Sequence, residues 1–192
     1  MVGVYFTCSI VIHLYVPASR SRQTQESGEI SRECAAFKES YAATRGNGRY
    51  GGKVPHETFV SQYHQDWLLY SAFFRHLELN GQTGHYLDVA AAWPKKLSNT
   101  WFFDKCQGWD GVCIEGDPSK VAQLEAKRSC VVVPTCVSDV QKKVTFVASE
   151  GTGGAGILGL ADINTTNYAE LDIPAPKEIE LTCTTLKDVG TK

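Results

Sequence analysis

The sequence predicts an α/β fold in which helices wind around a mainly parallel sheet. Short apolar segments alternate with helical segments from His85 to Val133, within about fifty residues. Glycine and proline residues separate these segments, and three acidic residues lie in or shortly after the strands. Because parallel strands need a crossover connection, usually a helix, this alternation is typical of a wound parallel sheet.

Composition fits a folded domain and gives no sign of nucleic-acid binding. The chain has 192 residues, 43% hydrophobic and 21% charged, which suits one domain or part of one. Lysine and arginine number 19 and aspartate and glutamate 21, so the net charge is -2. A nearly neutral chain lacks the overall positive charge that attracts phosphate backbones. We therefore expect no nucleic-acid partner.

The first segment, residues 1–18, has features of a signal peptide or a short membrane anchor. Val4–Val16 is an apolar run of 13 residues, and Val16-Pro17-Ala18 offers small residues for cleavage. A bilayer-spanning helix needs about 20 apolar residues, whereas the core of a signal peptide has roughly 7–15. Four alternatives remain: a secretory signal, a short anchor that associates the chain with a membrane, an N-terminal strand, or a misassigned start of the chain. Without a signal or anchor, we expect a cytoplasmic protein.

Two further divisions of the chain are predicted. Residues 19–58 are polar and mixed in charge, which predicts a flexible stem or linker with a short helix near Cys34–Tyr41. The folded domain is expected to span residues 59–192. It begins with a helix capped by Ser61, whose apolar face is formed by Leu68, Leu69, Ala72, Phe73 and Leu77.

The wound region follows this helix. Its predicted elements are a strand at His85–Ala91, a helix at Leu97–Cys106, a strand at Gly111–Ile114, a helix from Pro118 to Arg128 and a strand at Cys130–Val133. Asp117 and Pro118 are preferred residues for a helix start, and the last helical turn favours basic residues. Beyond it we predict a strand at Val144–Ala148, a loop at Glu150–Gly159, a strand at Glu178–Thr184 and a helix from Leu186.

Three acidic residues mark the predicted ligand-binding edge of the sheet. Asp88 lies in the first strand, Glu115 follows the second and Asp139 follows the third. Ligands of wound sheets bind outside the carboxyl ends of the strands, where an acid after the second strand accepts hydrogen bonds from ribose hydroxyls. Each acid alone is also explained by helix capping or exposure to water. Their shared position favours a nucleoside-type cofactor.

The loop after the first strand, Val89–Pro94, contains no glycine. A dinucleotide site needs G-x-G-x-x-G so that the backbone can approach a pyrophosphate. Its absence argues against pyrophosphate cofactors and therefore against a nicotinamide oxidoreductase. A cofactor without phosphates fits better, and S-adenosylmethionine is such a cofactor.

The seven cysteines and five histidines show no metal-binding pattern, so we expect no metal. Cys113 lies in an apolar segment, where we expect a buried free thiol. Without Cys8, six cysteines remain. An even number permits disulfides in an oxidising compartment.

Six short pieces, in their order and spacing, carry a resemblance to a known family. They are Ser61–Asp66, Tyr86–Ala91, Leu97–Phe103, Gly108–Pro118, Cys136–Asp139 and Cys183–Asp188. The segment from Ser61 to about Val189 resembles the FkbM-type family of S-adenosylmethionine-dependent methyltransferases. The resemblance implies a Rossmann-like class I fold that is incomplete at its C-terminus, since the family continues into another strand with an acidic motif.

The resemblance also implies a role for individual residues. Asp88, Ala90 and Ala91 would border the methionine part of the cofactor, and Glu115 would hold the ribose hydroxyls. Ser138-Asp139 would lie beside the adenine. Family members commonly carry glycine where Ala90 stands, so a methyl group occupies a place of close backbone approach.

The expected activity is O-methylation of a hydroxyl acceptor on a small molecule or glycan. Catalysis would come mostly from positioning, and no residue is assigned as the catalytic base. The alternative is a non-catalytic methyltransferase-like protein with a role in interaction or trafficking. The altered first loop and the apolar N-terminus favour this alternative.

Overall fold

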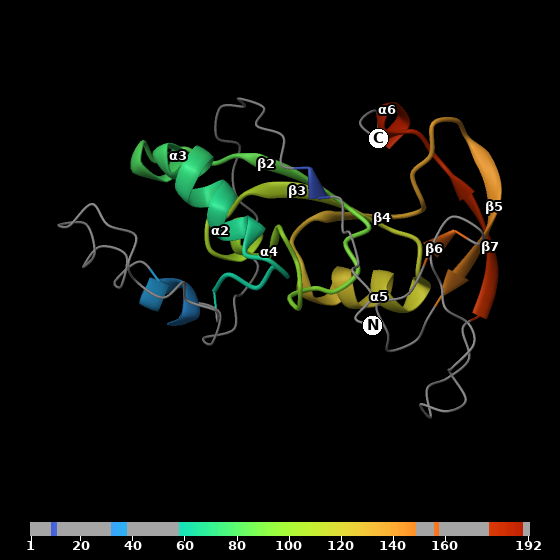
Figure 1. The fold of residues 1–192 in the computed structure, drawn as a ribbon, viewed down its shortest axis with the longest axis horizontal. Coiled ribbons are helices and arrows are strands. Elements are labelled where there is room, and N and C mark those ends of the chain that lie inside the picture. Colours follow the sequence, from blue (N-terminus) through green and yellow to red (C-terminus); the bar gives the residue numbers. More distant parts are fainter. Residues whose placement is uncertain (1–8, 11–31, 38–57, 149–155, 158–176, 190–192) are drawn as a thin grey trace.

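The computed structural model describes residues 9–10, 32–37, 58–148, 156–157 and 177–189. Within them the chain is a mixed α/β structure with two sheets, one mainly parallel and one antiparallel. The two sheets follow one another along the long axis of the molecule (Figure 1).

The mainly parallel sheet has the strand order β1-β2-β3-β4. β2 (His85–Val89), β3 (Asp110–Glu115) and β4 (Val131–Pro134) run parallel, and β1 (Ser9–Ile10) pairs antiparallel with β2. Parallel neighbours in sequence order are what the alternation of strands and helices predicts. The predicted parallel pairing is therefore confirmed for these three strands.

The helix between β3 and β4 is α5 (Pro118–Lys127). Its start is the predicted one, because the Asp117 carboxylate accepts a hydrogen bond from the Ser119 amide at 2.9 Å. This bond satisfies one of the unpaired amides of the first helical turn. The preference of aspartate for the cap and proline for the first turn is thus sufficient to locate this helix.

The helix between β2 and β3 is α4 (Trp101–Lys105), which is shorter than predicted. The prediction that it begins at Leu97 is wrong, because Leu97 has a left-handed φ of 60° and its backbone forms a β-bridge with Ser61. A left-handed residue cannot belong to a right-handed helix. The Ser98 hydroxyl instead accepts a hydrogen bond from the Trp101 amide at 3.1 Å, which supports the helix start there.

The antiparallel sheet has β5 (Lys142–Ala148) between β6 (Gly156–Ile157) and β7 (Lys177–Cys183). The predicted strands at 144–148 and 178–184 are confirmed, but they form a separate sheet and do not widen the parallel one. The predicted loop at 150–159 lies mostly outside the described residues. α6 (Leu186–Val189) follows β7 as predicted.

The helical segment before β2 consists of α2 (Gln65–Leu69), a π-helical turn η2 (Tyr70–Phe74) and α3 (Arg75–Leu79). The predicted apolar face is largely wrong, since Leu68 and Phe73 are each 60% exposed. Leu77 of the predicted face is buried as expected, and Tyr70, which was not part of that face, is buried as well. A π-turn is wider than an α-turn, so a face extrapolated at the α-helical period does not stay in register through it. His64, and not Ser61, occupies the N-cap position, but the Ser61 hydroxyl accepts a hydrogen bond from the first-turn amide of Asp66 at 3.3 Å, as predicted.

The core of the described residues is rich in aromatic side chains. Phe37, Phe59, Tyr70 and Phe102 pack together, with ring centroids of neighbouring pairs 4.4–6.2 Å apart. Phe37 belongs to a helical segment at residues 32–37, which confirms part of the short helix predicted near Cys34–Tyr41. This part of the predicted linker 19–58 is therefore packed into the core, and most of the remainder lies outside the described residues.

Six cysteines form three disulfides, which corrects the prediction that Cys113 is a free thiol. The pairs are Cys34–Cys106, Cys113–Cys130 and Cys136–Cys183. The sequence allowed disulfides but could not pair the cysteines, because the partners are 72, 17 and 47 residues apart along the chain. Such bonds persist in oxidising compartments.

The N-terminal segment 1–18 is described only at Ser9 and Ile10. These two residues form β1, which agrees with the alternative of an N-terminal strand over that short stretch. Among the helices in the described ranges, none has the length and apolar character to span a bilayer. The predicted signal peptide or anchor otherwise lies outside the described residues.

Candidate functional site

The loop after β2 has an unusual backbone. Ala90 and Ala92 have left-handed φ values of 58° and 52°, a conformation that glycine adopts without steric cost and alanine does not. The Ala91 side chain between them is buried, and its amide donates a hydrogen bond to the Ile114 carbonyl at 3.1 Å. The loop therefore has the backbone shape of a glycine-type turn, although alanine occupies both left-handed positions.

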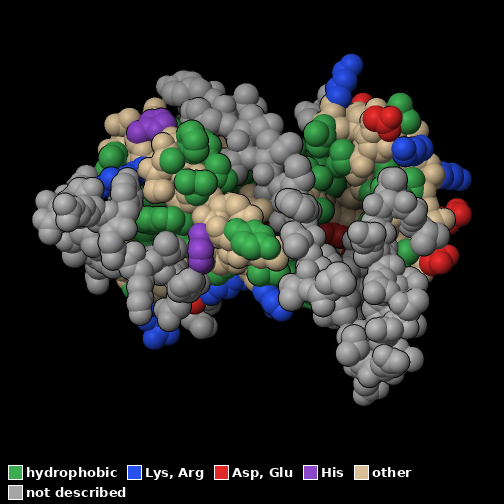
Figure 2. Space-filling model, in the orientation of Figure 1, with side chains coloured by type: hydrophobic (Ala, Val, Ile, Leu, Met, Phe, Trp, Pro, Cys, Tyr) green, Lys and Arg blue, Asp and Glu red, His purple; other side chains and the backbone are tan. Residues whose placement is uncertain are grey.

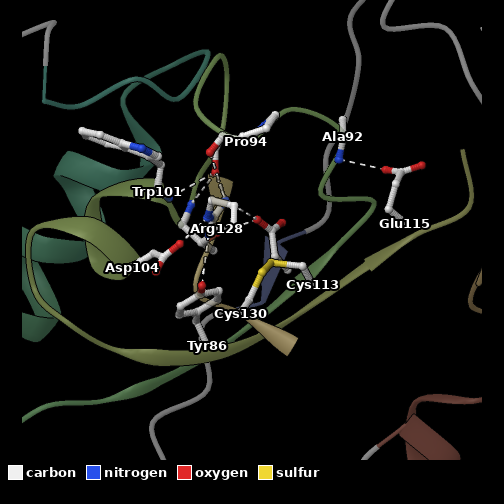
Figure 3. A network of polar contacts seen from close by, with 12 residues as sticks. Tyr86, Ala92, Pro94, Trp101, Asp104, Cys113, Glu115, Arg128 and Cys130 are labelled. Carbon is white, nitrogen blue, oxygen red and sulfur yellow. Dashed lines mark hydrogen bonds and ion pairs between the residues drawn. A yellow bond between two sulfur atoms is a disulfide. The ribbon is translucent and has the colours of Figure 1, made fainter. Parts of the chain in front are cut away.

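Glu115, at the carboxyl end of β3, holds this loop. Its carboxylate accepts hydrogen bonds from the amide of Ala92 (Figure 3) and from the amide of Asp117, each at 2.8 Å. Glu115 is only 5% exposed, and this burial raises the pKa of its carboxyl group, while the two amides and the nearby Lys120 oppose the rise. The predicted ribose-binding acid therefore lies at the predicted edge, directly bonded to the first loop.

A buried lysine lies beside this acid. The Lys120 ammonium, on α5, is 3.7 Å from the Asp117 carboxylate and 5.4 Å from the centroid of the Trp93 ring. An ammonium over an indole face is a favourable cation–π contact. Trp93 is thus fixed between the first loop and α5, and one positive charge lies close to the acidic end of β3.

Asp88 is directed away from Glu115 into a different, fully buried network. It accepts a hydrogen bond from the Thr100 hydroxyl, and its carboxylate is 3.9 Å from a guanidinium nitrogen of Arg128. Asp88 is 1% exposed. Its predicted place in the first strand is confirmed, whereas the hydrogen bond and ion pair of its carboxylate are with Thr100 and Arg128.

Arg128 is the centre of that network (Figure 3). Its guanidinium donates to the Asp104 carboxylate, the Ser98 hydroxyl at 3.2 Å, the Thr100 hydroxyl at 2.8 Å, the Tyr86 hydroxyl at 3.2 Å and the Pro94 carbonyl at 3.4 Å. Burial alone would lower the pKa of Arg128, but its Tyr86, Asp104 and Asp88 neighbours raise it above the usual arginine value. The charge of Arg128 is therefore permanent.

Sequence reasoning missed this network. Arg128 was assigned only to the C-terminal turn of α5, where a basic residue complements the helix dipole. A basic residue at a helix end is usually exposed, and nothing local distinguishes one that turns inward. The only sequence signal is that Asp88, Asp104 and Thr100 are polar residues within otherwise apolar stretches.

Ser138 and Asp139 lie elsewhere on the surface. The Ser138 hydroxyl donates to Asp139 at 2.9 Å, and Lys142 donates to the same carboxylate at 3.4 Å, so the pKa of Asp139 is lowered. The Ser138 amide bonds the Thr184 carbonyl at 2.9 Å, next to the antiparallel sheet. Among the described residues, neither side chain has a hydrogen bond or ion pair with the loop after β2 or with Glu115.

The turn at residues 61–66, to which the sequence analysis assigned no chemical role, is a second buried hydrogen-bonded cluster. The buried Asp66 carboxylate accepts hydrogen bonds from the Ser61 hydroxyl at 2.6 Å and the Val60 amide at 2.8 Å. Burial raises the pKa of Asp66, and these bonds oppose the rise. Ser61 in turn forms a β-bridge with Leu97, in the connection that leads from the first loop to α4.

Comparisons with known proteins give no assignment. No family model, no curated protein and no solved structure matches this chain at a significant level. In the described part of the chain, no three histidine, cysteine, aspartate or glutamate side chains are grouped to hold a metal ion.

Proposed function

We propose that this chain is a Rossmann-like, class I methyltransferase domain of the FkbM type, which binds S-adenosylmethionine at the carboxyl ends of β2 and β3. One observation carries the proposal: the 2.8 Å hydrogen bond from the Ala92 amide to the Glu115 carboxylate. It brings a glycine-type loop and a buried acid together where wound sheets bind nucleosides.

The residues at this edge fit such a cofactor. An ionised carboxylate has about four positions at which it can accept hydrogen bonds, and the Ala92 and Asp117 amides use two of those of Glu115. The others suit the two hydroxyls of a ribose. A pyrophosphate fits less well, because no glycine in residues 89–94 allows the backbone to approach it closely.

The cofactor would supply an electrophilic methyl group to a hydroxyl of a small-molecule or glycan acceptor. The Glu115 carboxylate would orient the ribose, and the backbone of Ala90–Ala92 would border the methionine part. Ser138 and Asp139 are assigned to the adenine end, which requires the β4–β5 connection to approach the loop. No described residue is assigned as a base, so positioning is the contribution of this part of the chain.

Calorimetric titration of the full chain with S-adenosylmethionine, S-adenosylhomocysteine and NAD⁺ tests the proposal. Binding of the first two without binding of NAD⁺ is expected. Glu115→Gln should weaken binding about tenfold or more, since it removes a charged acceptor of ribose hydroxyls. Asp110→Asn is the matched control, because this exposed acid lies at the opposite end of β3. Absence of binding by a folded wild-type chain contradicts the proposal.

A different observation favours a non-catalytic role in interaction. Four large apolar side chains around α2, η2 and α3 are 55–62% exposed, namely Tyr63, Leu68, Phe73 and Leu79. Hydrophobic side chains gather over these helices on the face drawn in Figure 2, whereas charged side chains gather over the antiparallel sheet. Contiguous exposed apolar residues mark interaction sites. A chain that binds no cofactor and changes its sedimentation with Leu68→Ser and Phe73→Ser supports this candidate.

A further inference from the structure

The backbone of Arg128 is held in place independently of the contacts of its side chain. Arg128 is the C-cap residue of α5, and its amide donates a hydrogen bond to the Leu124 carbonyl at 2.8 Å. Two residues later, Cys130 is joined to Cys113 of β3 by a disulfide. The Arg128 backbone is therefore held from both sides, and the side chain, 0% exposed, projects into the domain from a fixed origin.

The side chain of Arg128 contacts the chain on both sides of the loop at residues 89–93, which follows β2. The guanidinium lies 3.9 Å from the carboxylate of Asp88 and donates to the carbonyl of Pro94, the two residues that flank residues 89–93. The Thr100 hydroxyl strengthens the first of these links, because it accepts from Arg128 at 2.8 Å and donates to Asp88. One side chain thus fixes both ends of residues 89–93.

This loop needs such support. Ala90 and Ala92 both adopt the left-handed conformation, which is unfavourable for alanine, and a strained backbone persists only where the surroundings hold it. Glu115 holds the middle of the loop through the Ala92 amide, and Arg128 holds its two ends. A loop held at three points presents its backbone to a ligand without a prior cost of ordering.

We propose that Arg128 is a positioning residue that keeps the Ala90–Ala92 loop in its ligand-binding conformation. The part of this inference that concerns the cofactor rests on the proposed function; the part that concerns the loop does not. The competing explanation is that Arg128 only compensates the buried charges around it, since removal of one partner of a buried ion pair destabilises the whole domain.

Two variants weaken the hold on the loop, and a third serves as the matched control. Arg128→Lys keeps the positive charge but loses the planar guanidinium group, which donates hydrogen bonds to several acceptors at once. Thr100→Val removes the hydroxyl between Arg128 and Asp88 with little change of shape, and it serves if Arg128→Lys does not fold. Tyr86→Phe also removes one hydroxyl that Arg128 contacts, but this one lies on β2, outside the loop connection.

Hydrogen exchange of the amides in residues 89–97 is measured for each folded, full-length chain. We expect exchange in this segment about tenfold faster in Arg128→Lys and Thr100→Val, with the α5 amides unchanged and with Tyr86→Phe close to wild type. Uniformly faster exchange across the domain, or no change in the loop, overturns the positioning role, because a purely stabilising residue would affect all segments together.

The dissociation constant of S-adenosylhomocysteine is then measured for the same chains. We expect an increase of about tenfold in the two loop variants and little change in Tyr86→Phe, because a displaced loop costs contacts with the ligand. Unchanged affinity despite a loosened loop overturns the link between Arg128 and the cofactor. A wild-type chain that does not bind the ligand, with the exchange pattern as expected, overturns the proposed function and leaves the hold of Arg128 on the loop established.

Discussion

The backbone amide of Ala92 donates a 2.8 Å hydrogen bond to the carboxylate of Glu115, which joins the loop after β2 to the end of β3. Residues 23 positions apart are brought into direct contact by the parallel pairing of these two strands. Glu115, which the sequence analysis assigns to ligand binding, therefore also holds the loop after β2 in its conformation. Substitution of Glu115 should therefore change stability as well as binding.

The first prediction concerns the pH dependence of stability. Burial raises the pKa of Glu115 above its ordinary value of 4.5, so between that value and the folded-state pKa the folded chain binds more protons than the unfolded chain. The contribution of Glu115 to stability is therefore largest at pH values below its ordinary pKa, and it is lost as the pH rises through the folded-state pKa. Glu115→Gln does not titrate, so its free energy of unfolding should fall less than that of wild type.

Urea unfolding of both chains at pH values from about 4 to 8 measures this difference, and a tenfold change in proton affinity corresponds to about 1.4 kcal/mol. Asp66, whose pKa is also raised by burial, contributes to both chains and cancels in the comparison. If wild type instead gains stability over Glu115→Gln as the pH rises, the two amides and Lys120 outweigh the burial of Glu115.

The second prediction concerns the strain at Ala90. Ala90→Gly should raise the free energy of unfolding by about 1 kcal/mol, because relief of a left-handed alanine exceeds the added entropy of glycine in the unfolded chain. Ala91→Gly is the matched control: this residue is buried and lacks a positive φ, so the same change should destabilise by about 1 kcal/mol or more. Destabilisation by both changes would show that Ala90 is not strained.

The third prediction concerns the disulfides. In the chain-entropy model, removal of Cys34–Cys106, which spans 72 residues, should cost about 4 kcal/mol. Removal of Cys113–Cys130, which spans 17 residues, should cost about 3 kcal/mol. Paired substitutions to serine and chemical unfolding give these values. Peptide mapping without reductant should recover the three cross-linked pairs, and other pairings or free thiols in the folded chain would contradict the assignment.

Local chemistry predicted much of the parallel sheet. Asp117 and Pro118 located the start of α5, and apolar runs located β2, β3 and β4, because capping and burial act within a few residues. The position of Glu115 at the sheet edge follows from the same reasoning, since a strand that ends at a polar residue places it there.

The rest depended on contacts that local patterns do not encode. Arg128 bonds Asp104 and Tyr86 across 24 and 42 residues of chain, and its inward direction is decided by buried acids and not by its helix. The apolar face of the first helix was wrong because the η2 turn interrupts the α-helical period. The separate antiparallel sheet also could not be read from two strand patterns, because the pattern of a strand does not identify its partner.

The last prediction tests the close packing under the Arg128 network. Gly111 on β3 lies opposite Tyr86 on β2, and a Cβ atom at this position would be 2.2 Å from the Tyr86 ring. Gly111→Ala must therefore displace the ring whose hydroxyl bonds Arg128, and we expect a loss of about 1–3 kcal/mol in unfolding free energy. Thermal unfolding measures it, with Tyr86→Phe/Gly111→Ala as a test of coupling. If the ring displacement acts through Arg128, the double variant should lose less than the sum of the two single losses, whereas additive losses would assign the cost to steric overlap alone.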